Sequence, residues 1–166
     1  MGEGLLGALL LAQGVMGGLD TLINHELLEG LPHRRSARAE VGLHTVREAF
    51  YGVLFIGLAW FAWHGAFAAV LGALLALEVL VMASDEFVEN RARVLPQNER
   101  VMHVFLTLNY GAIVVLLAFQ IAEWRALPTA LAPVYYGWMT WVLSALGAAS
   151  AAWSVRDFIA FRRLKG

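Results

Sequence analysis

The chain has 166 residues, of which 60% are hydrophobic and 15% charged, and its mean hydropathy is +0.65. This composition excludes an ordinary soluble domain and is typical of a small membrane protein with several spans. There is no cysteine and the formal net charge is −1, which excludes thiolate-bound zinc, iron–sulfur clusters and disulfides and argues against nucleic acid as a partner.

Five apolar stretches are long enough to cross a hydrocarbon core of about 30 Å. They cover residues 4–23, 46–63, 66–84, 101–122 and 133–153. The first is interpreted as a retained helix and not as a signal peptide, because it lacks a basic leading region and has Asp20 where a cleavage site needs small neutral residues. The expected fold class is an all-α polytopic membrane protein, with residues 1–166 forming a single transmembrane domain.

Turn-forming residues mark the helix boundaries in the two longer connections. Gly30 and Pro32 are expected to end the first helix, and Ser36 is expected to cap the second. Pro96 and Asn98 are expected to play the same roles before the fourth helix. The connections therefore predict helices that run back and forth across the membrane.

The basic residues lie almost entirely on one side of this arrangement. Of the twelve Lys and Arg residues, only Arg125 falls in a connection on the opposite side. By the positive-inside rule, the N-terminus faces out and the C-terminus faces the cytoplasm. We expect a multi-pass protein of a bacterial-type inner (plasma) membrane, in contact with the lipid bilayer. The residues expected to act only as topology anchors are Arg34, Arg35, Arg38 and Arg47.

A short motif is repeated in the second and fourth predicted helices. Glu40-Val-Gly-Leu-His44 returns as Glu99-Arg-Val-Met-His103, and a Tyr-Gly pair follows each copy, at Tyr51-Gly52 and Tyr110-Gly111. Each copy places a carboxylate and an imidazole one helical turn apart on one face, as a transition metal requires of a rigid helix.

The first and third predicted helices also match, which indicates an internal duplication. Their polar residues share the spacing i, i+7, i+11, which follows one helical face. These are Gln13, Asp20 and Asn24 in the first helix and Glu78, Asp85 and Glu89 in the third. We expect two hairpin repeats, residues 4–64 and 66–124, that form a four-helix bundle, and a fifth transmembrane helix at 133–160.

Ionisable residues gather in or next to the cytoplasmic halves of these four helices. A charged side chain within a span costs about 2.5–3.5 kcal/mol, so we expect such residues to be paired, bound to a ligand or used in function. Four carboxylates and two imidazoles suit two bridged iron or manganese ions, whose charge would neutralise the acids. The candidate metal ligands are Asp20, Glu40, His44, Asp85, Glu99 and His103.

Further acids and histidines are surplus to this set. They are interpreted as alternative ligands or as hydrogen-bond partners of the ligands. These residues are His25, Glu26, Glu48, Glu78 and Glu89. The helical rise predicts that Asp20 lies level with His44. It also predicts that Asp85 lies near His103.

The arrangement resembles the ferritin-like di-iron carboxylate proteins, whose four-helix bundle takes one carboxylate from each of two helices and a Glu-x-x-His motif from each of the other two. The resemblance covers about residues 13–111 and departs in one respect, since Glu and His are four positions apart in this chain. It implies two metal ions, iron or else manganese or zinc. It also implies dioxygen chemistry on a lipophilic substrate, as in a hydroxylase, a desaturase or a quinol oxidase.

Such an enzyme would need reducing equivalents, which would come from a separate reductase or from quinol. Tyr51 and Tyr110, on the same face as the histidines and two turns deeper, are expected to line a substrate chamber or relay protons. The competing interpretation of each tyrosine is a buried side chain that hydrogen-bonds across helices.

Three other functions remain open. In the first, the acids and histidines pair with arginines in a non-catalytic salt-bridged cytoplasmic cap, although Asp20 and Asp85 lie deeper than interface arginines are expected to reach. In the second, His44 and His103 are axial ligands of a b-type haem. In the third, the chain is a proton-coupled metal or solute carrier, for which its small size would require a homo-oligomer.

Overall fold

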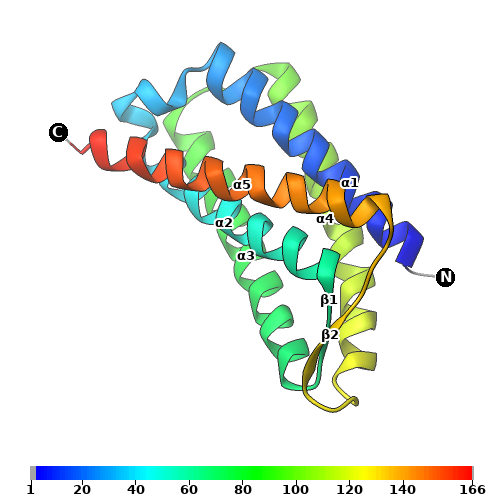
Figure 1. Cartoon of the computed structure of the whole chain (residues 1–166). Coiled ribbons are helices and arrows are strands. Elements are labelled where there is room, and N and C mark those ends of the chain that lie inside the picture. The colour runs from blue at the N-terminus through cyan, green and yellow to red at the C-terminus, as the bar shows by residue number, and fades with distance from the viewer. Residues whose placement is uncertain (1–2, 166) are drawn as a thin grey trace.

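The computed structural model describes residues 3–165, and most of these residues are helical (Figure 1). The long helices of this part of the chain are α1 Glu3–Asp20, α2 Arg38–Trp60, α3 Ala66–Ala92, α4 Gln97–Trp124 and α5 Trp138–Arg163. Each overlaps one predicted apolar stretch, and none has a proline in its interior, where proline would break the helical hydrogen bonds. The predicted helical class is confirmed.

The backbone of α1 continues directly into a π-helical segment, Thr21–Leu28. Gly30 then adopts φ +59°, a left-handed conformation that glycine reaches without strain, and Pro32 lies in the short 3₁₀ turn that follows. These two residues end the first helix as predicted. Both predicted caps are wrong. Ser36 lies within a second 3₁₀ turn and the N-cap position of α2 is Ala37, while Asn98 lies inside α4, whose N-cap position is Pro96.

Two short strands, which the sequence did not predict, join the connections at the opposite end of the molecule. The strand β1 Phe61–His64 pairs with β2 Ala130–Pro133 in an antiparallel ribbon. Gly65 follows β1 with φ +58° and turns the chain into α3. The predicted fifth span begins at residue 133, but α5 begins at Trp138, because the residues from 130 to 133 are extended.

The closest helix packing lies between α2 and α5, which cross in Figure 1. Glycines permit this approach: a Cβ at Gly147 would lie 3.2 Å from the backbone oxygen of Gly52. The helix α1 packs mainly on α4 and also contacts α5. The division into hairpins 4–64 and 66–124 stays a prediction. The most extensive contacts join α2 to α5 and α1 to α4, and neither of these pairs belongs to one predicted hairpin.

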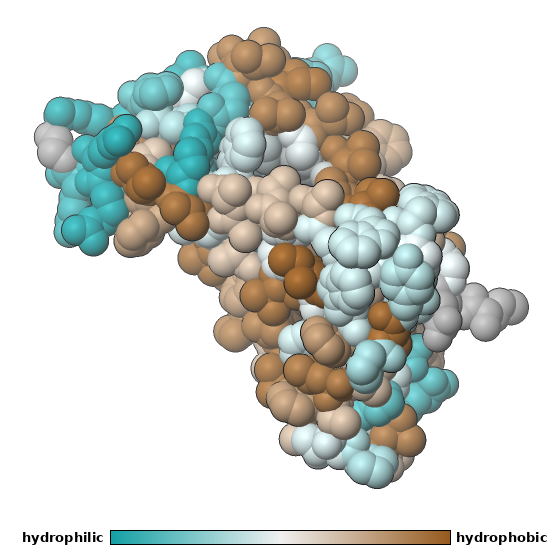
Figure 2. Space-filling model, viewed as in Figure 1, coloured by the Kyte–Doolittle hydropathy of each residue, from teal (hydrophilic) through white to brown (hydrophobic). Residues whose placement is uncertain are grey.

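Among residues 3–165, three helical stretches are long and apolar enough to cross a membrane. They are Gly4–Leu28, Ala66–Ala92 and Gln97–Trp124, with mean hydropathies of 1.5, 2.4 and 2.0 over their most apolar windows. The other two long helices of the described residues, α2 and α5, are not among them. Figure 2 shows hydrophilic residues gathered at the end of the molecule where α5 ends, and hydrophobic residues spread along the helices.

Candidate metal centre

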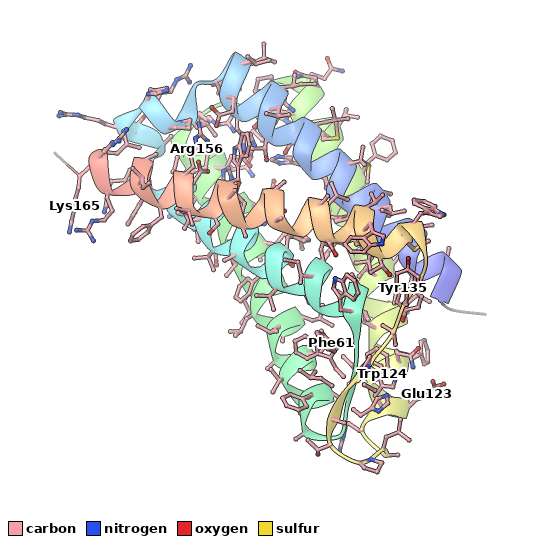
Figure 3. The ribbon with its side chains drawn as sticks, viewed as in Figure 1. Phe61, Glu123, Trp124, Tyr135, Arg156 and Lys165 are labelled. Atoms are coloured by element: carbon pink, nitrogen blue, oxygen red, sulfur yellow. The ribbon has the colours of Figure 1, made fainter. Side chains whose placement is uncertain are left out.

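Buried acids and histidines from the first four helices meet toward the end of the molecule that carries the α1–α2 connection. Figure 3 labels Arg156 at this end of the molecule, where many side-chain nitrogen and oxygen atoms are drawn. The side chains of Glu40, Glu78 and Glu99 are 0% exposed, and Glu89 is 1% exposed. Burial of a charge is costly unless it is paired, so the partners of these groups decide what the cluster can do.

The side chain of His103 in α4 contacts acidic side chains of both α1 and α3. Its Nε2 atom lies 3.2 Å from Oδ2 of Asp20, and its Nδ1 atom lies 3.4 Å from Oε2 of Glu89. The more exposed Glu86 lies 3.8 Å from the same Nδ1 atom. Both imidazole nitrogens therefore face carboxylates, and the packing of α1 on α4 brings Asp20 to this histidine.

The π-helical segment brings His25 into the same cluster. In an α-helix, His25 would lie about 140° around the axis from Asp20, because there are 3.6 residues per turn. The wider π turn, with its i→i+5 hydrogen bonds, brings the two residues to one side. Nε2 of His25 lies 3.5 Å from Asp20 and 3.4 Å from Glu99, and its ring stacks on that of His44 with the centroids 4.4 Å apart.

Four of these residues lie close enough together to be candidate ligands of one metal ion. Each offers one ligand atom, and the four atoms lie within 4.8 Å of one another. Two ligands on opposite sides of a metal ion with bonds near 2.1 Å are about 4.2 Å apart, so a small inward movement would place all four around one ion. The four residues are His25, Glu89, Glu99 and His103.

Arg93, in the connection between α3 and α4, lies among three of the carboxylates. Its Nη2 atom lies 2.9 Å from Glu40, 2.5 Å from Glu89 and 2.5 Å from Glu99. Burial disfavours the charged guanidinium, but the hydrogen bonds to Glu99 and Glu40 outweigh it and hold the pKa of Arg93 above its usual range. Two predicted ligands, Glu40 and Glu99, thus already have a cationic partner.

A second group of contacts surrounds His44. Its Nε2 atom lies 3.3 Å from Oδ2 of Asp85, which was predicted to lie near His103. Arg47 donates to the same oxygen at 2.7 Å, and its Nε atom lies 3.6 Å from Glu78. The interpretation of Arg47 as only a topology anchor is wrong, because this long side chain turns inward and reaches two acids that were expected to lie deeper than interface arginines reach.

The two predicted catalytic tyrosines lie together beyond this group. The ring centroids of Tyr51 and Tyr110 are 6.0 Å apart, and Tyr110 is 2% exposed. Gln13 of α1 donates to the Tyr51 hydroxyl at 3.0 Å and accepts a hydrogen bond from Asn109 of α4 at 2.7 Å. Both tyrosines are neighbours of the Glu78 carboxylate. Tyr51 thus takes part in an interhelical hydrogen bond, as the competing interpretation holds.

Glu26 has a separate partner. It forms an ion pair with Arg156 of α5, which also contacts Asp157 at 2.7 Å. The candidate ligands therefore fall into three groups, one around His25 and His103, one around His44, and Glu26 alone at α5.

A cavity of about 220 Å³ adjoins the first two groups, and we call it the central cavity. Its polar wall includes Asp20, His25, His44, Asp85 and His103. Its remaining wall is largely apolar and includes Gly17, Leu22, Phe55, Leu146, Ala149 and Trp153. Leu22 in the π-helical segment is 45% exposed, and the other residues of this wall come mainly from α1 and α5, so the cavity lies close to the surface there.

Comparisons with known proteins found no match for this chain. No family model, curated protein or solved structure matches it. The class of protein is therefore defined by its own features: a mostly helical chain with three helices apolar enough to cross a membrane, and a buried histidine–carboxylate cluster beside a cavity.

Proposed function

We propose that the protein is an integral membrane di-metal oxidoreductase that acts with dioxygen on a lipophilic substrate. One observation carries the proposal: histidines and carboxylates from four helices converge on one wall of a cavity whose other wall is apolar. Such a cavity offers a place where a lipophilic molecule would lie against bound metal ions. The resemblance to the ferritin-like di-iron carboxylate proteins remains one of pattern.

Two neighbouring groups of donors would hold the ions. The first is the quartet His25, Glu89, Glu99 and His103. The second is the pair His44 and Asp85, with Asp20 beside both His25 and His103. Oxygen and imidazole donors suit iron or manganese, and also zinc. Bound iron or manganese would supply electron transfer to dioxygen.

The chain's own residues would hold and orient the ions and shape the chamber. Tyr51 and Tyr110 would close the deeper end of the site, where their hydroxyls lie beside Glu78. The apolar wall would exclude water from the substrate. Reducing equivalents would come from quinol or a separate reductase, and the substrate would arrive through the bilayer between α1 and α5.

The proposal includes the membrane arrangement. All five long helices would cross a bacterial-type inner membrane, with the N-terminus outside and the C-terminus in the cytoplasm. The support is the distribution of arginines, because Arg125 stands apart from the eleven other basic residues. The charges of α2 would then be shielded from lipid, since Glu40 is 0% and His44 7% exposed.

Metal content per polypeptide tests the proposal. Protein purified in detergent from cells grown without chelators is expected to hold about two iron or manganese atoms per chain. His103→Ala and His25→Ala are expected to lose metal while remaining inserted. His33→Ala is the matched control, because His33 is exposed and lies outside the cluster. Protein that stays free of metal after anaerobic reconstitution with ferrous iron would overturn the proposal.

A second candidate function is favoured by the arginines. Arg93 contacts three buried glutamates, and Arg47 contacts Asp85, so the acids have cationic partners without a metal. In this case the cluster is a non-catalytic salt-bridged cap. The two candidates separate in the reconstitution experiment, since only the metal centre would bind ferrous iron in proportion to the chain and lose it in the histidine variants.

A further inference from the structure

The central cavity has a size that restricts what it can hold. Its volume of about 220 Å³ exceeds the roughly 150 Å³ of an engineered cavity that binds benzene. A Cβ added at Gly17 or Gly18 would meet nothing within 4 Å, so the glycines of α1 leave this space open. A single substituted ring fits such a volume, with any longer chain leaving between α1 and α5.

The walls of the cavity favour an aromatic ring. Tyr51, Phe55 and Trp153 all line it, together with three histidines. Aromatic rings pack favourably against one another at offset or edge-on angles, beyond the area that they bury. A flexible saturated chain would gain less from these walls and would lose more conformational freedom on binding.

The ionisable side chains of the cavity favour a neutral ligand over an anionic one. Five carboxylates line it, against one arginine and three histidines: Asp20, Glu48, Asp85, Glu86 and Glu89. The arginine and two of the histidines already contact acids, so a fatty acid or a phosphate-bearing lipid would find no free cation to pair with. A neutral polar end therefore fits the wall best.

Polar atoms without partners indicate which neutral group it carries. Within residues 3–165, Oε2 of Glu48 and Oδ1 of Asp85 accept no hydrogen bond, and Nε of Arg47 and Nε1 of Trp153 donate none. All four residues line the cavity, and a small side-chain movement would present each of these atoms to a ligand there. Because buried polar groups are usually hydrogen-bonded, the ligand is expected to supply both donors and acceptors. A hydroxyl group does both, whereas a carbonyl only accepts.

From these features we infer that the central cavity binds a lipophilic molecule whose head is a hydroxyl-bearing aromatic ring, a phenol or a hydroquinone. The ring lies between α1, α2 and α5, with its hydroxyl toward Glu48 and Asp85. That this molecule is the substrate of the enzyme rests on the proposed function. That it binds in the central cavity does not require a bound metal.

Calorimetric titration of detergent-purified protein, stripped of metal by a chelator, tests the inference. The probes are decylhydroquinone, decanol and decanoate, which share a ten-carbon chain. Decylhydroquinone is expected to bind at least about tenfold more tightly than decanol, and decanoate is expected not to bind. Equal or tighter binding of decanol or decanoate would overturn the inference.

Two variants fill the cavity from opposite walls. Gly17→Leu and Ala149→Leu are each expected to weaken decylhydroquinone binding about tenfold or more. Gly111→Leu is the control, because Gly111 is exposed, has open space around it and lies outside the cavity. Unchanged affinity in both cavity variants, with helicity retained, would overturn the inference.

The two proposals fail in different ways. A protein that binds no metal but binds decylhydroquinone in the cavity contradicts the proposed function and leaves the ring site standing. A protein that binds metal but shows no preference for the ring contradicts the inference alone.

Discussion

Nη2 of Arg93 lies 2.9 Å from Oε1 of Glu40, although the two residues are 53 positions apart in the chain. The same nitrogen contacts Glu89 and Glu99 at 2.5 Å each. The guanidinium therefore occupies the space between carboxylates that a metal centre would also use. A guanidinium and a divalent cation are alternative ways to neutralise the same buried charge, so Arg93 pairing and metal binding are expected to compete.

This competition predicts the behaviour of Arg93→Gln. Without metal, the variant leaves buried glutamates without a cation and is expected to be less stable by about 3–5 kcal/mol. Added ferrous or manganous ion is expected to restore much of this stability, because the ion binds the folded state and replaces the lost charge. Thermal unfolding in detergent with and without the ion measures both effects.

Arg91→Gln is the matched control for this experiment. Arg91 is exposed, and its guanidinium lies over the ring of Phe87 instead of among the acids. Its replacement is expected to leave stability and metal response unchanged. If Arg93→Gln is destabilised and metal gives no rescue, the salt-bridged cap is the better account of the cluster.

Asp20 is expected to position both histidines of the metal quartet. Its Oδ2 atom contacts His103 at 3.2 Å and His25 at 3.5 Å, and Asn24 donates to its Oδ1 atom at 2.6 Å. Asp20→Asn keeps the size of the side chain but removes its charge. Loss of such a partner typically weakens metal affinity 10–100-fold, so a loss of about that size is expected, with the number of bound ions unchanged.

Competition with a chelator of known affinity measures this effect. Glu86→Gln provides the comparison, because Glu86 also faces His103 but lies farther away, at 3.8 Å, and is 59% exposed. Its replacement is expected to change the affinity little. Equal losses in the two variants would point to a general charge effect and would contradict a positioning role for Asp20.

Local patterns in the sequence predicted the helices well. The spacing of Glu40 to His44, and of Glu99 to His103, places each pair on one α-helical face. In the packed structure the two glutamates share Arg93 as a partner, while His103 faces Glu89 and His44 faces Asp85 in a neighbouring group. The stretches of Leu, Ala and Val are likewise sufficient to predict long helices, because propensity and hydrophobicity act over many residues.

Features that depend on tertiary contacts could not be predicted in this way. His25 joins the cluster through a π turn, and five positions from Asp20 is the wrong spacing for an α-helical face. Arg93 lies in a polar connection, where an arginine ordinarily faces water, and only the packed helices turn it toward the acids. The strands β1 and β2 are four residues each, too short to give a period-two signal.

The close packing of α2 on α5 leads to a prediction about stability. A Cβ at Gly147 would lie 2.7 Å from a side-chain carbon of Ile56 and 3.2 Å from the backbone oxygen of Gly52. Gly147→Ala is therefore expected to destabilise the protein by about 1–3 kcal/mol through overpacking. Gly111→Ala, with open space at its Cβ position, is expected to be neutral or to stabilise by up to about 1 kcal/mol.

Unfolding of both variants in mixed micelles, followed by circular dichroism, measures the difference. Both substitutions improve intrinsic helix propensity by the same amount, so any difference between them reports packing. Equal stability of the two variants would show that α2 and α5 do not approach this closely.

The membrane arrangement can be tested with single cysteines, because the chain contains none of its own. If all five long helices cross, exposed positions Arg35 and Val94 face the cytoplasm and exposed Ala126 faces outside. If only the three most apolar stretches cross, α2 stays on the cytoplasmic side. Val94 and Ala126 then exchange sides, while Arg35 stays in the cytoplasm.

Labelling in intact cells separates the two arrangements. With five spans, a membrane-impermeant maleimide is expected to label Ala126→Cys and neither Arg35→Cys nor Val94→Cys, and all three are expected to be labelled after permeabilisation. Labelling of Val94→Cys in place of Ala126→Cys would contradict the five-span arrangement and would move α2 and the acids that it carries to the membrane surface.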